Sequence, residues 1–567
     1  MKPILHTARL HFDQEHLDLV PDKFNSGEKL YVDFTLDHNG TDLQTTLSVH
    51  PKTPIALKGL ELRFSIDYPA SAKVWCSGLH PRRHAAEHLI TDKSTSKGWL
   101  APTPPTPWAD PVVPISIPLF SWSYGYIKTG ENDYLLIGST NEETAFTHIG
   151  YDYVNQQLVI QKDIIDLELS HSFPLLELSI LQGNRADVFK HYFDKFSNSQ
   201  TSPGGEQLIN SAYTGWMAHK ARGTHSTDAI RRFLKIKKEK NIPADMILIG
   251  PGYEKSMGDW LYSNDQFPDG LPSLIQEIKE DGLKAGIAIT PLLASPSSDL
   301  FQDHRDWLLK DDKQQLATFK LDGDQYHVLD VYHSGVIDYL QSFCYRIITQ
   351  WGVDLLRVDH LSAAYAVERS HKTRAQVITD ILKMFRGSCP NTLLWATGLP
   401  YITGWTMADY VATTSNTLGV WNKRFPFLHH DPVADITGAQ LMSALGRFHA
   451  SGKAGFSVIQ LKEDKKWTIL QQSTVLILTA LLGKIHLLTD PVDEISEEAW
   501  AEWRMVTELK EAEVLNIFSL ENGCFKINFK NKGGEFAGYF NLGNVTSKVD
   551  EIGLDLGVGE HVVLGSV

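Results

Sequence analysis

The chain has 567 residues, which is too long for one compact core, so we expect two or three domains. Hydrophobic residues make up 42% and charged residues 21%, as in ordinary soluble globular proteins. The net charge of −15 argues against binding to nucleic acid or to an anionic membrane, because both favour clustered Lys and Arg. The 14 Trp and 19 Tyr suit a carbohydrate binder, although the core of a large protein is the better explanation of these counts alone.

The four cysteines lie far apart, without the CxxC or CxH spacing of zinc and redox motifs, which argues against a metal site and a disulfide framework. They are Cys76, Cys344, Cys389 and Cys524. A short apolar run at the start is interrupted by His6, Arg9 and His11, so no secretory signal is predicted. No apolar stretch reaches transmembrane length, and we expect a cytoplasmic protein without a cofactor.

Residues 1–200 alternate short apolar runs with Gly, Pro, Asn and Asp turns. This period-two pattern predicts an N-terminal antiparallel β-sandwich domain. Residues 101–111 are Pro-rich and are predicted to form a loop. The segment Phe196–Gln207 has the composition of a linker to the next domain.

From residue 201 to 500 the pattern changes to β-branched runs that alternate with amphipathic segments of helix length. Eight strands are expected, at 211–219, 244–250, 284–290, 353–359, 391–397, 408–414, 454–461 and 484–490. This number and spacing predict a (β/α)8 TIM barrel. A doubly wound open sheet is the competing fold, but it requires a Gly-rich phosphate loop after its first strand, and residues 223–228 do not form one. Residues 501–567 return to strand patterns and predict a small C-terminal β domain.

Catalytic side chains of a parallel barrel follow the C-terminal ends of its strands. This rule selects Trp216, His219, 250–253, Arg357, Asp359, His360, Thr397, Gly398, 414–416 and Asp490. Asp359 is the strongest candidate, because it ends an apolar run and has Arg357 two residues earlier on the same strand face. The guanidinium would keep the carboxylate ionised, as a nucleophile requires. An Arg–Asp ion pair that is purely structural fits the pattern equally well.

Several motifs in this region resemble glycoside hydrolase family 36, the α-galactosidases. The similar pieces are Gly-Asp-Trp at 258–260, Phe-Pro-Asp-Gly-Leu at 267–271, Asp-Trp-Leu at 306–308 and Val-Leu-Asp at 328–330. Arg357-Val358-Asp359 resembles the family's nucleophile strand, which usually reads Lys-X-Asp. Residues 396–421 resemble its Gly-Cys-Gly segment followed by Asp-X-X-Arg-X-X-X-Asp. The resemblance runs from about Gly215 to Asp490 and agrees with the expected three-domain layout.

The resemblance implies a retaining α-galactoside hydrolase that binds carbohydrate. In such enzymes one Asp attacks the anomeric carbon, and a second carboxyl about 5–5.5 Å away protonates the leaving oxygen. By position Asp359 is the nucleophile, and the acid/base falls on Asn416. An amide is neither a proton donor nor a base of that kind, so general catalysis worth about 10²–10⁴-fold would be lost.

Other family positions also differ. Gly250 and Pro251 stand where the family has its sugar-binding Asp-Asp pair, Ala412 where it has Arg, and Thr397 where it has Cys. Trp260 is retained as an aromatic wall of the sugar site. The remaining residues expected to bind substrate are Arg357, Gly398, Trp75 and Trp216.

Two functions therefore stay open: a hydrolase with altered specificity or weakened activity, and a non-catalytic glycan-binding or scaffold descendant. Replacement acids would be Glu254, Asp259, His219 or His360, whereas Asp409 begins the sixth strand and is expected at the opposite end of the barrel. A metal site from His219, His360 and Asp359 would lack a recognisable ligand spacing. Many family members oligomerise, so the resemblance also admits a homo-oligomer.

Overall fold

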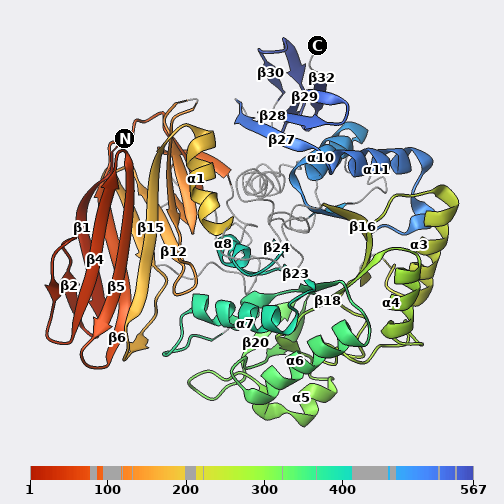
Figure 1. Ribbon diagram of the computed structural model, residues 1–567, viewed down its shortest axis with the longest axis horizontal. Helices are drawn as coiled ribbons and strands as arrows, with labels where there is room; N and C mark the ends of the chain where they lie inside the picture. The colour runs from red at the N-terminus through yellow and green to blue at the C-terminus, as the bar shows by residue number, and fades with distance from the viewer. Residues whose placement is uncertain are drawn as a thin grey trace.

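A computed structural model describes most of the chain. The described residues are 2–76, 86–92, 117, 119–130, 132–197, 212–220, 223–321, 323–365, 367–411, 457–459, 468–520, 524–542 and 546–565. An N-terminal β-sandwich, a curled parallel sheet with helices around it, and a C-terminal antiparallel sheet follow one another along the chain (Figure 1).

Two antiparallel sheets form the sandwich, as the period-two pattern predicts. The first contains β1 (Ile4–Phe12), β2 (Glu15–Asp18), β6 (Ile55–Ser65), β9 (Phe120–Trp122), β12 (Thr147–Asp152), β13 (Gln157–Lys162) and β14 (Leu167–Leu169). The second contains β3 (Asn25–Ser26), β4 (Leu30–Asn39), β5 (Asp42–Pro51), β7 (Lys73–Cys76), β8 (Ala86–Leu89), β10 (Tyr124–Lys128), β11 (Tyr134–Ser139) and β15 (Phe173–Gly183). Buried side chains such as Leu47 and Leu62 fill the space between them, and α1 (Arg185–Ser197) lies against β11 and β15.

The central sheet is entirely parallel. Its strands are β16 (Tyr213–Ala218), β17 (Met246–Ile249), β18 (Lys284–Ile289), β22 (Leu355–Val358), β23 (Leu393–Ala396), β24 (Tyr410–Val411), β25 (Ser457–Ile459) and β26 (Ile485–Leu488). All eight predicted strands are present, in the spatial order β24-β23-β22-β18-β17-β16-β26-β25. That is the order of a (β/α)8 barrel opened between its sixth and seventh strands. Pairing of β24 with β25 is not among the pairings of the described residues, so closure of the barrel stays a prediction.

Helices connect these strands, as their amphipathic patterns predict. They are α3 (Thr227–Lys240), α4 (Leu271–Glu280), α5 (Asp299–Asp303), α6 (Ser334–Thr349), α7 (Arg374–Ser388), α8 (Tyr401–Trp405), α10 (Ile469–Leu482) and α11 (Glu497–Leu509), with short 3-10 turns at Arg305–Trp307, Leu361–Tyr365 and Val492–Glu494. Local signals fix their ends: Ser226 accepts a hydrogen bond from the Ala229 amide at the start of α3, and Asn241 ends that helix in the left-handed conformation.

Side chains of the central sheet alternate between its two faces. Leu355 on β22 and Trp395 on β23 belong to the inward-facing cluster, whereas Leu356 and Val358 pack in the layer shared with the helices. By the same alternation Arg357 faces inward. Arg357 therefore lies on the inward face of β22, close to the C-terminal end of the sheet, where the predicted catalytic residues follow the strands.

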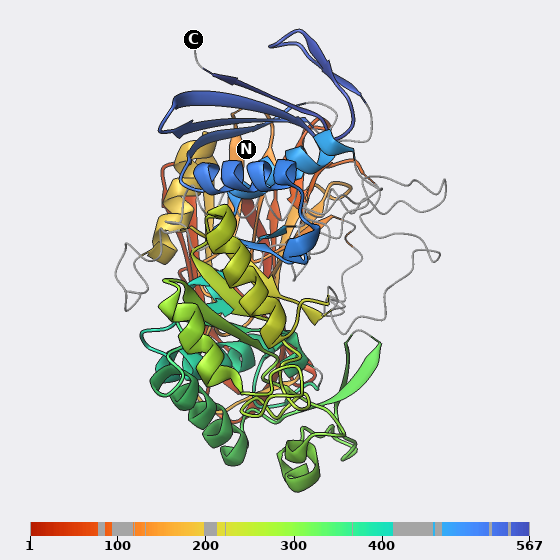
Figure 2. The same cartoon turned by 90° about the vertical axis from the view of Figure 1, so that its right-hand side faces the viewer.

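The C-terminal residues form an antiparallel sheet of β27 (Glu513–Ser519), β28 (Cys524–Asn531), β29 (Gly534–Asn541) and β32 (His561–Gly565). A small pair, β30 (Ser547–Val549) and β31 (Leu554–Leu556), accompanies it. This C-terminal sheet lies at the top of Figure 1 and Figure 2. It is joined to α10 by a hydrogen bond from the Thr474 hydroxyl to the Gly559 carbonyl at 2.7 Å. The predicted domain limits at residues 200 and 500 stay predictions.

A small three-stranded sheet, inserted between β18 and α6, was not predicted. It contains β19 (Leu293–Ala294), β20 (Thr318–Leu321) and β21 (Asp324–Val328). Among the described residues, no helix is both long enough and apolar enough to cross a membrane.

Candidate active site

Asp359 follows β22 at the C-terminal end of the parallel sheet and is 4% exposed. Its amide donates to the Ile289 carbonyl at 2.8 Å, which ties it to the neighbouring strand β18. Its Oδ1 accepts two hydrogen bonds, from Arg357 Nε at 2.7 Å and from the Thr397 hydroxyl at 2.8 Å. The carboxylate is thus held from two strands at once.

Arg357 is fixed on its other side by aromatic and sulfur contacts. Its guanidinium carbon lies 4.4 Å from the ring centroid of Trp395, the residue opposite it on β23. Its Nη1 lies 3.9 Å from Met217 Sδ. A guanidinium held in this way gives Asp359 a charge-assisted hydrogen bond with little freedom to move.

The chain turns sharply after Asp359. His360 has φ +60°, in the left-handed region that non-glycine residues seldom adopt, and its amide donates to Thr397 Oγ1 at 3.3 Å. The His360 ring lies 6.2 Å from that of Phe319 on β20. The unpredicted insertion therefore contacts the residue next to Asp359, and a period-based analysis of the barrel could not have found this contact.

The loop after β17 is shaped for glycine. A Cβ on Gly250 would lie 2.6 Å from the Ala218 carbonyl oxygen and 3.0 Å from Met217 Cε, so any side chain there requires a shift of the backbone. The Gly250 carbonyl is within 2.8 Å of His225 Nε2, and burial lowers the pKa of His225 to about 4. Pro251 is half-buried in the same turn. A carboxylate like that of the resembling family does not fit at position 250 in this backbone.

The proposed replacement acids lie in different environments. Glu254 is buried, which raises its pKa, and its Oε2 accepts from the Gly252 amide at 2.7 Å. Asp259 accepts hydrogen bonds from the backbone amides of Asp299 and Leu300, both at 3.1 Å. Its carboxylate therefore stabilises the N-terminus of α5.

Asp409 and His219 complete this set. Asp409 pairs with Arg386 at 2.6 Å and accepts from the Leu394 amide at the N-terminal end of the strands, the end that the sequence predicted for it. The His219 amide donates to the Thr224 hydroxyl at 3.0 Å, at the same sheet end as Asp359.

The three tryptophans expected at the sugar site are all buried. Trp260 is fully inaccessible, and its amide lies 3.3 Å from the Tyr339 hydroxyl. Trp216 stacks on Phe233 of α3 at 5.2 Å and donates from Nε1 to the Asp490 carbonyl. This places Trp216 in the layer between sheet and helix.

Trp75 stacks on Tyr126 at a centroid distance of 5.8 Å, on the face of the second sheet that packs against α1. Gly398, with φ +75°, turns the chain after β23. The roles of these residues in sugar binding stay predictions. Asn416 and Ala412 lie outside the described residues. Among the residues described, no group of three or more His, Cys, Asp or Glu side chains could hold a metal ion.

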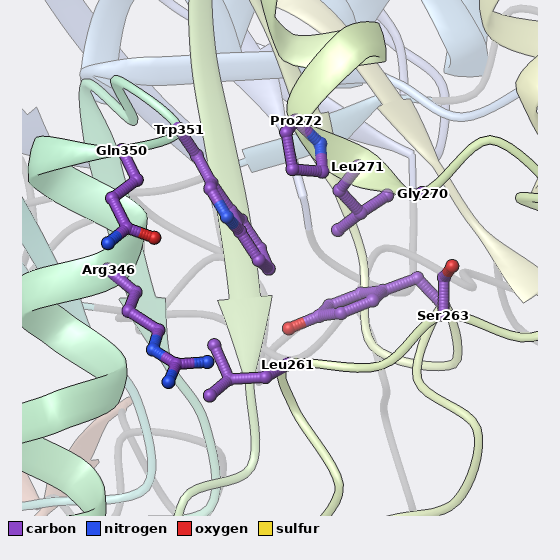
Figure 3. Close-up of a pocket in the computed structure, with 9 residues that line it drawn as sticks. Leu261, Ser263, Gly270, Leu271, Pro272, Arg346, Gln350 and Trp351 are labelled. Atoms are coloured by element: carbon purple, nitrogen blue, oxygen red, sulfur yellow. The ribbon is translucent and has the colours of Figure 1, made fainter.

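A cavity of about 220 Å³ lies elsewhere, between the start of α4 and the end of α6 (Figure 3). It is lined by Tyr253, Leu261, Ser263, Gly270, Leu271, Pro272, Arg346, Gln350 and Trp351. Neither Asp359 nor its hydrogen-bond partners line it, so we place the candidate active site at Asp359 and not at this cavity.

Comparisons with known proteins point to one family. A family profile described as Melibiase matches residues 252–386, a stretch that contains Trp260, Arg357 and Asp359. The α-galactosidase AgaA of Geobacillus stearothermophilus is 27% identical over 137 residues, which are 23% of this chain and 18% of that protein. The α-galactosidase of Escherichia coli is 27% identical over 131 residues, again 23% of this chain and 18% of that protein. The matched part thus spans less than a quarter of either relative.

Solved structures are similar over most of the chain. TtGalA, an α-galactosidase from Thermus thermophilus in complex with p-nitrophenyl α-D-galactopyranoside, has a TM-score of 0.63 and 17% identity, covering 92% of this chain and 98% of its own. AgaA from Geobacillus stearothermophilus has a TM-score of 0.61 and 12% identity, covering 96% and 79%. The fold is therefore that of the family 36 α-galactosidases. Together with the Melibiase match and the α-galactosidase relatives, this fold supports the resemblance of the chain to glycoside hydrolase family 36, as a divergent relative.

Proposed function

We propose that this protein is a retaining α-glycoside hydrolase of the α-galactosidase type, with altered sugar specificity or weakened activity. Asp359 would act from the mouth of a closed (β/α)8 barrel. Its carboxylate attacks the anomeric carbon, the bond to the leaving oxygen breaks, and that oxygen takes up a proton. Water then releases the sugar from the aspartyl ester with its anomeric configuration retained.

The geometry of Asp359 carries this proposal. A nucleophilic carboxylate must be ionised, fixed and open on one oxygen. Oδ1 is held by Arg357 and Thr397, whereas no hydrogen bond to Oδ2 is found among the described residues. Oδ2 is therefore the oxygen left for a sugar. The matched stretch 252–386 contains this carboxylate, which supports descent from a glycosidase nucleophile.

Protonation of the leaving group is the weak step. Asn416 stands at the family's acid/base position and does not transfer a proton. Glu254 is the described carboxyl best suited to replace it, because its burial raises its pKa and a general acid must stay protonated near the working pH. Substrates with good leaving groups, which need little acid help, should therefore be cleaved best.

Recognition of the sugar should also differ from that of the relatives. The Gly250–Pro251 turn supplies no carboxylate for sugar hydroxyls, and the fit around Gly250 leaves no room for one. A site that lacks such partners loses preference for the sugar that required them. We therefore expect activity on an α-glycoside other than, or in addition to, α-galactoside.

A non-catalytic glycan-binding or scaffold role is the second candidate, and the same two positions, Asn416 and Gly250, favour it. One set of measurements separates the two. Aryl α-galactoside, α-glucoside and N-acetyl-α-galactosaminide with nitrophenyl leaving groups are offered to wild type and to Asp359→Gly. Turnover by wild type, and formation of the β-glycosyl azide by Asp359→Gly in added azide, would support the hydrolase.

Asp409→Ala is the matched control, because it removes a buried aspartate from the opposite end of the sheet. It should cost stability without creating a response to azide. If wild type turns over none of the three substrates but binds a sugar at equilibrium, the glycan-binding role replaces the proposed hydrolase. The cytoplasmic location and a homo-oligomeric state remain part of the proposal.

A further inference from the structure

Thr397 occupies a special place beside the candidate nucleophile. It follows β23, whose register with β22 pairs Arg357 with Trp395, so Thr397 comes next to Asp359 at the sheet end. Its side chain is largely buried, and its own amide donates to the Val358 carbonyl at 2.9 Å. The backbone of Thr397 is thereby fixed to the strand that carries Asp359.

The direction of the hydrogen bonds through Thr397 follows from chemistry alone. The His360 amide is only a donor, so the Thr397 oxygen must accept from it at 3.3 Å. An ionised carboxylate only accepts, so the Thr397 hydroxyl must donate its proton to Asp359 Oδ1 at 2.8 Å. The sharp turn at His360 therefore brings the amide that orients the hydroxyl toward the nucleophile.

Two donors from two strands meet at the same oxygen. Arg357 Nε and Thr397 Oγ1 both bond Oδ1, so rotation of the carboxylate about its Cβ–Cγ bond would break both hydrogen bonds. Oδ1 is also the less nucleophilic oxygen, because its lone pairs are engaged. The β-branched threonine side chain itself has few rotamers, which keeps the donor in place.

We infer that Thr397 is a positioning residue for the nucleophile: its hydroxyl, oriented by the His360 amide, locks Asp359 so that Oδ2 attacks the sugar. This gives Thr397 a role toward Asp359 instead of the contact with sugar expected from the sequence. The inference rests on the proposed hydrolase function.

The test compares Thr397→Val, which keeps the shape and removes the hydroxyl, with Thr397→Ser, which keeps the hydroxyl. Steady-state kinetics are measured on whichever nitrophenyl α-glycoside the wild type cleaves. Thr397→Val should lower kcat by about 10–100-fold with KM changed less than about 3-fold, because a lost hydrogen bond to a charged group has roughly that effect. Thr397→Ser should keep kcat within about 3-fold of wild type.

Thr392→Val is the control, since Thr392 is equally buried at the other end of the same segment. It should leave both constants unchanged, and thermal melts identify any variant that has lost its fold. A Thr397→Val enzyme as fast as wild type, or a Thr397→Ser enzyme as slow as Thr397→Val, overturns the inference and leaves the hydrolase intact. A rise in KM alone returns Thr397 to sugar binding. Absence of turnover in wild type removes the proposed function and this inference with it.

Discussion

Arg374 at the start of α7 and Asp163, which directly follows β13 of the sandwich, form an ion pair that joins the sandwich to the central parallel sheet and its helices. Arg374 Nε lies 2.8 Å from Asp163 Oδ2, and the side chains are 17% and 5% exposed. The Glu168 amide and the Ser370 carbonyl add a backbone hydrogen bond at 2.6 Å across the same boundary. The sandwich is therefore anchored to the helix that precedes β23, the strand leading to Thr397.

Replacing Arg374 should loosen this anchor. Arg374→Ala leaves the Asp163 carboxylate buried without its cation, which should lower the free energy of unfolding by about 2–4 kcal/mol. Lys383→Ala is a suitable comparison, because Lys383 pairs with Glu143 across the same boundary but is 58% exposed. It should cost less than about 1 kcal/mol. Urea unfolding measures both, and equal effects of the two changes would contradict the anchor.

A substitution at Gly250 tests the packing of the loop that follows β17. Gly250→Ala places a Cβ within 2.6 Å of the Ala218 carbonyl oxygen, and we expect a loss of about 1–3 kcal/mol from overpacking. Gly59→Ala is the control, since a Cβ on Gly59 of β6 meets no atom within 4 Å. Thermal unfolding should separate the two variants clearly. A Gly250→Ala protein as stable as wild type would mean that this loop can move, and that a carboxylate could be accommodated there after all.

Some features of the fold and of the candidate site could be predicted from the sequence, and others could not. The sandwich and all eight parallel strands were predictable, because period-two and β-branched patterns reflect which faces of a strand are buried. The place of Asp359 at the C-terminal end of β22 was predictable because this residue ends such a run, whereas its catalytic role stays a prediction. The β20–β21 hairpin was not predicted, because its short strands lie within a longer connection between barrel units. Contacts such as that of Thr397 with Asp359 depend on strand register, which no local pattern encodes. Burial of Trp260 and Trp75 was likewise beyond sequence reasoning, since their neighbours are distant in the chain.

The environment of His225 predicts a dependence of stability on pH. Burial lowers its pKa to about 4, below the ordinary value of 6.5, so the unfolded chain binds this proton more readily than the folded one. Stability should therefore fall as pH decreases from about 6.5 to about 4, by at most about 3 kcal/mol from this residue. His225→Gln, which cannot titrate, should flatten that part of the profile in urea unfolding at several pH values. An unchanged slope between pH 4 and 6.5 would show that other groups dominate.

Arg357 should matter for both stability and rate. Arg357→Met keeps an apolar side chain against Trp395 but removes the Arg357 hydrogen bond to Asp359. Of the two donors to Oδ1, the Thr397 hydroxyl then remains. We expect a loss of about 2–4 kcal/mol in the free energy of unfolding and a fall of at least about 10-fold in kcat. The double variant Arg357→Met/Asp359→Asn should recover much of the stability, because no charge is then buried alone. Stability that stays low in the double variant would assign the loss to packing instead.

Asn416→Asp tests the assignment of the acid/base position directly. If position 416 faces Asp359 across the sugar, a carboxyl there can protonate the leaving oxygen, and kcat/KM should rise by about 10²–10⁴-fold on alkyl glycosides and oligosaccharides. Nitrophenyl glycosides need less protonation and should gain much less. Asn416→Ala serves as the control and should not exceed wild type on either class. A gain restricted to nitrophenyl substrates would point to altered binding. If no substrate shows a gain, Glu254 becomes the candidate acid. Glu254→Gln should then abolish the residual activity on substrates with poor leaving groups.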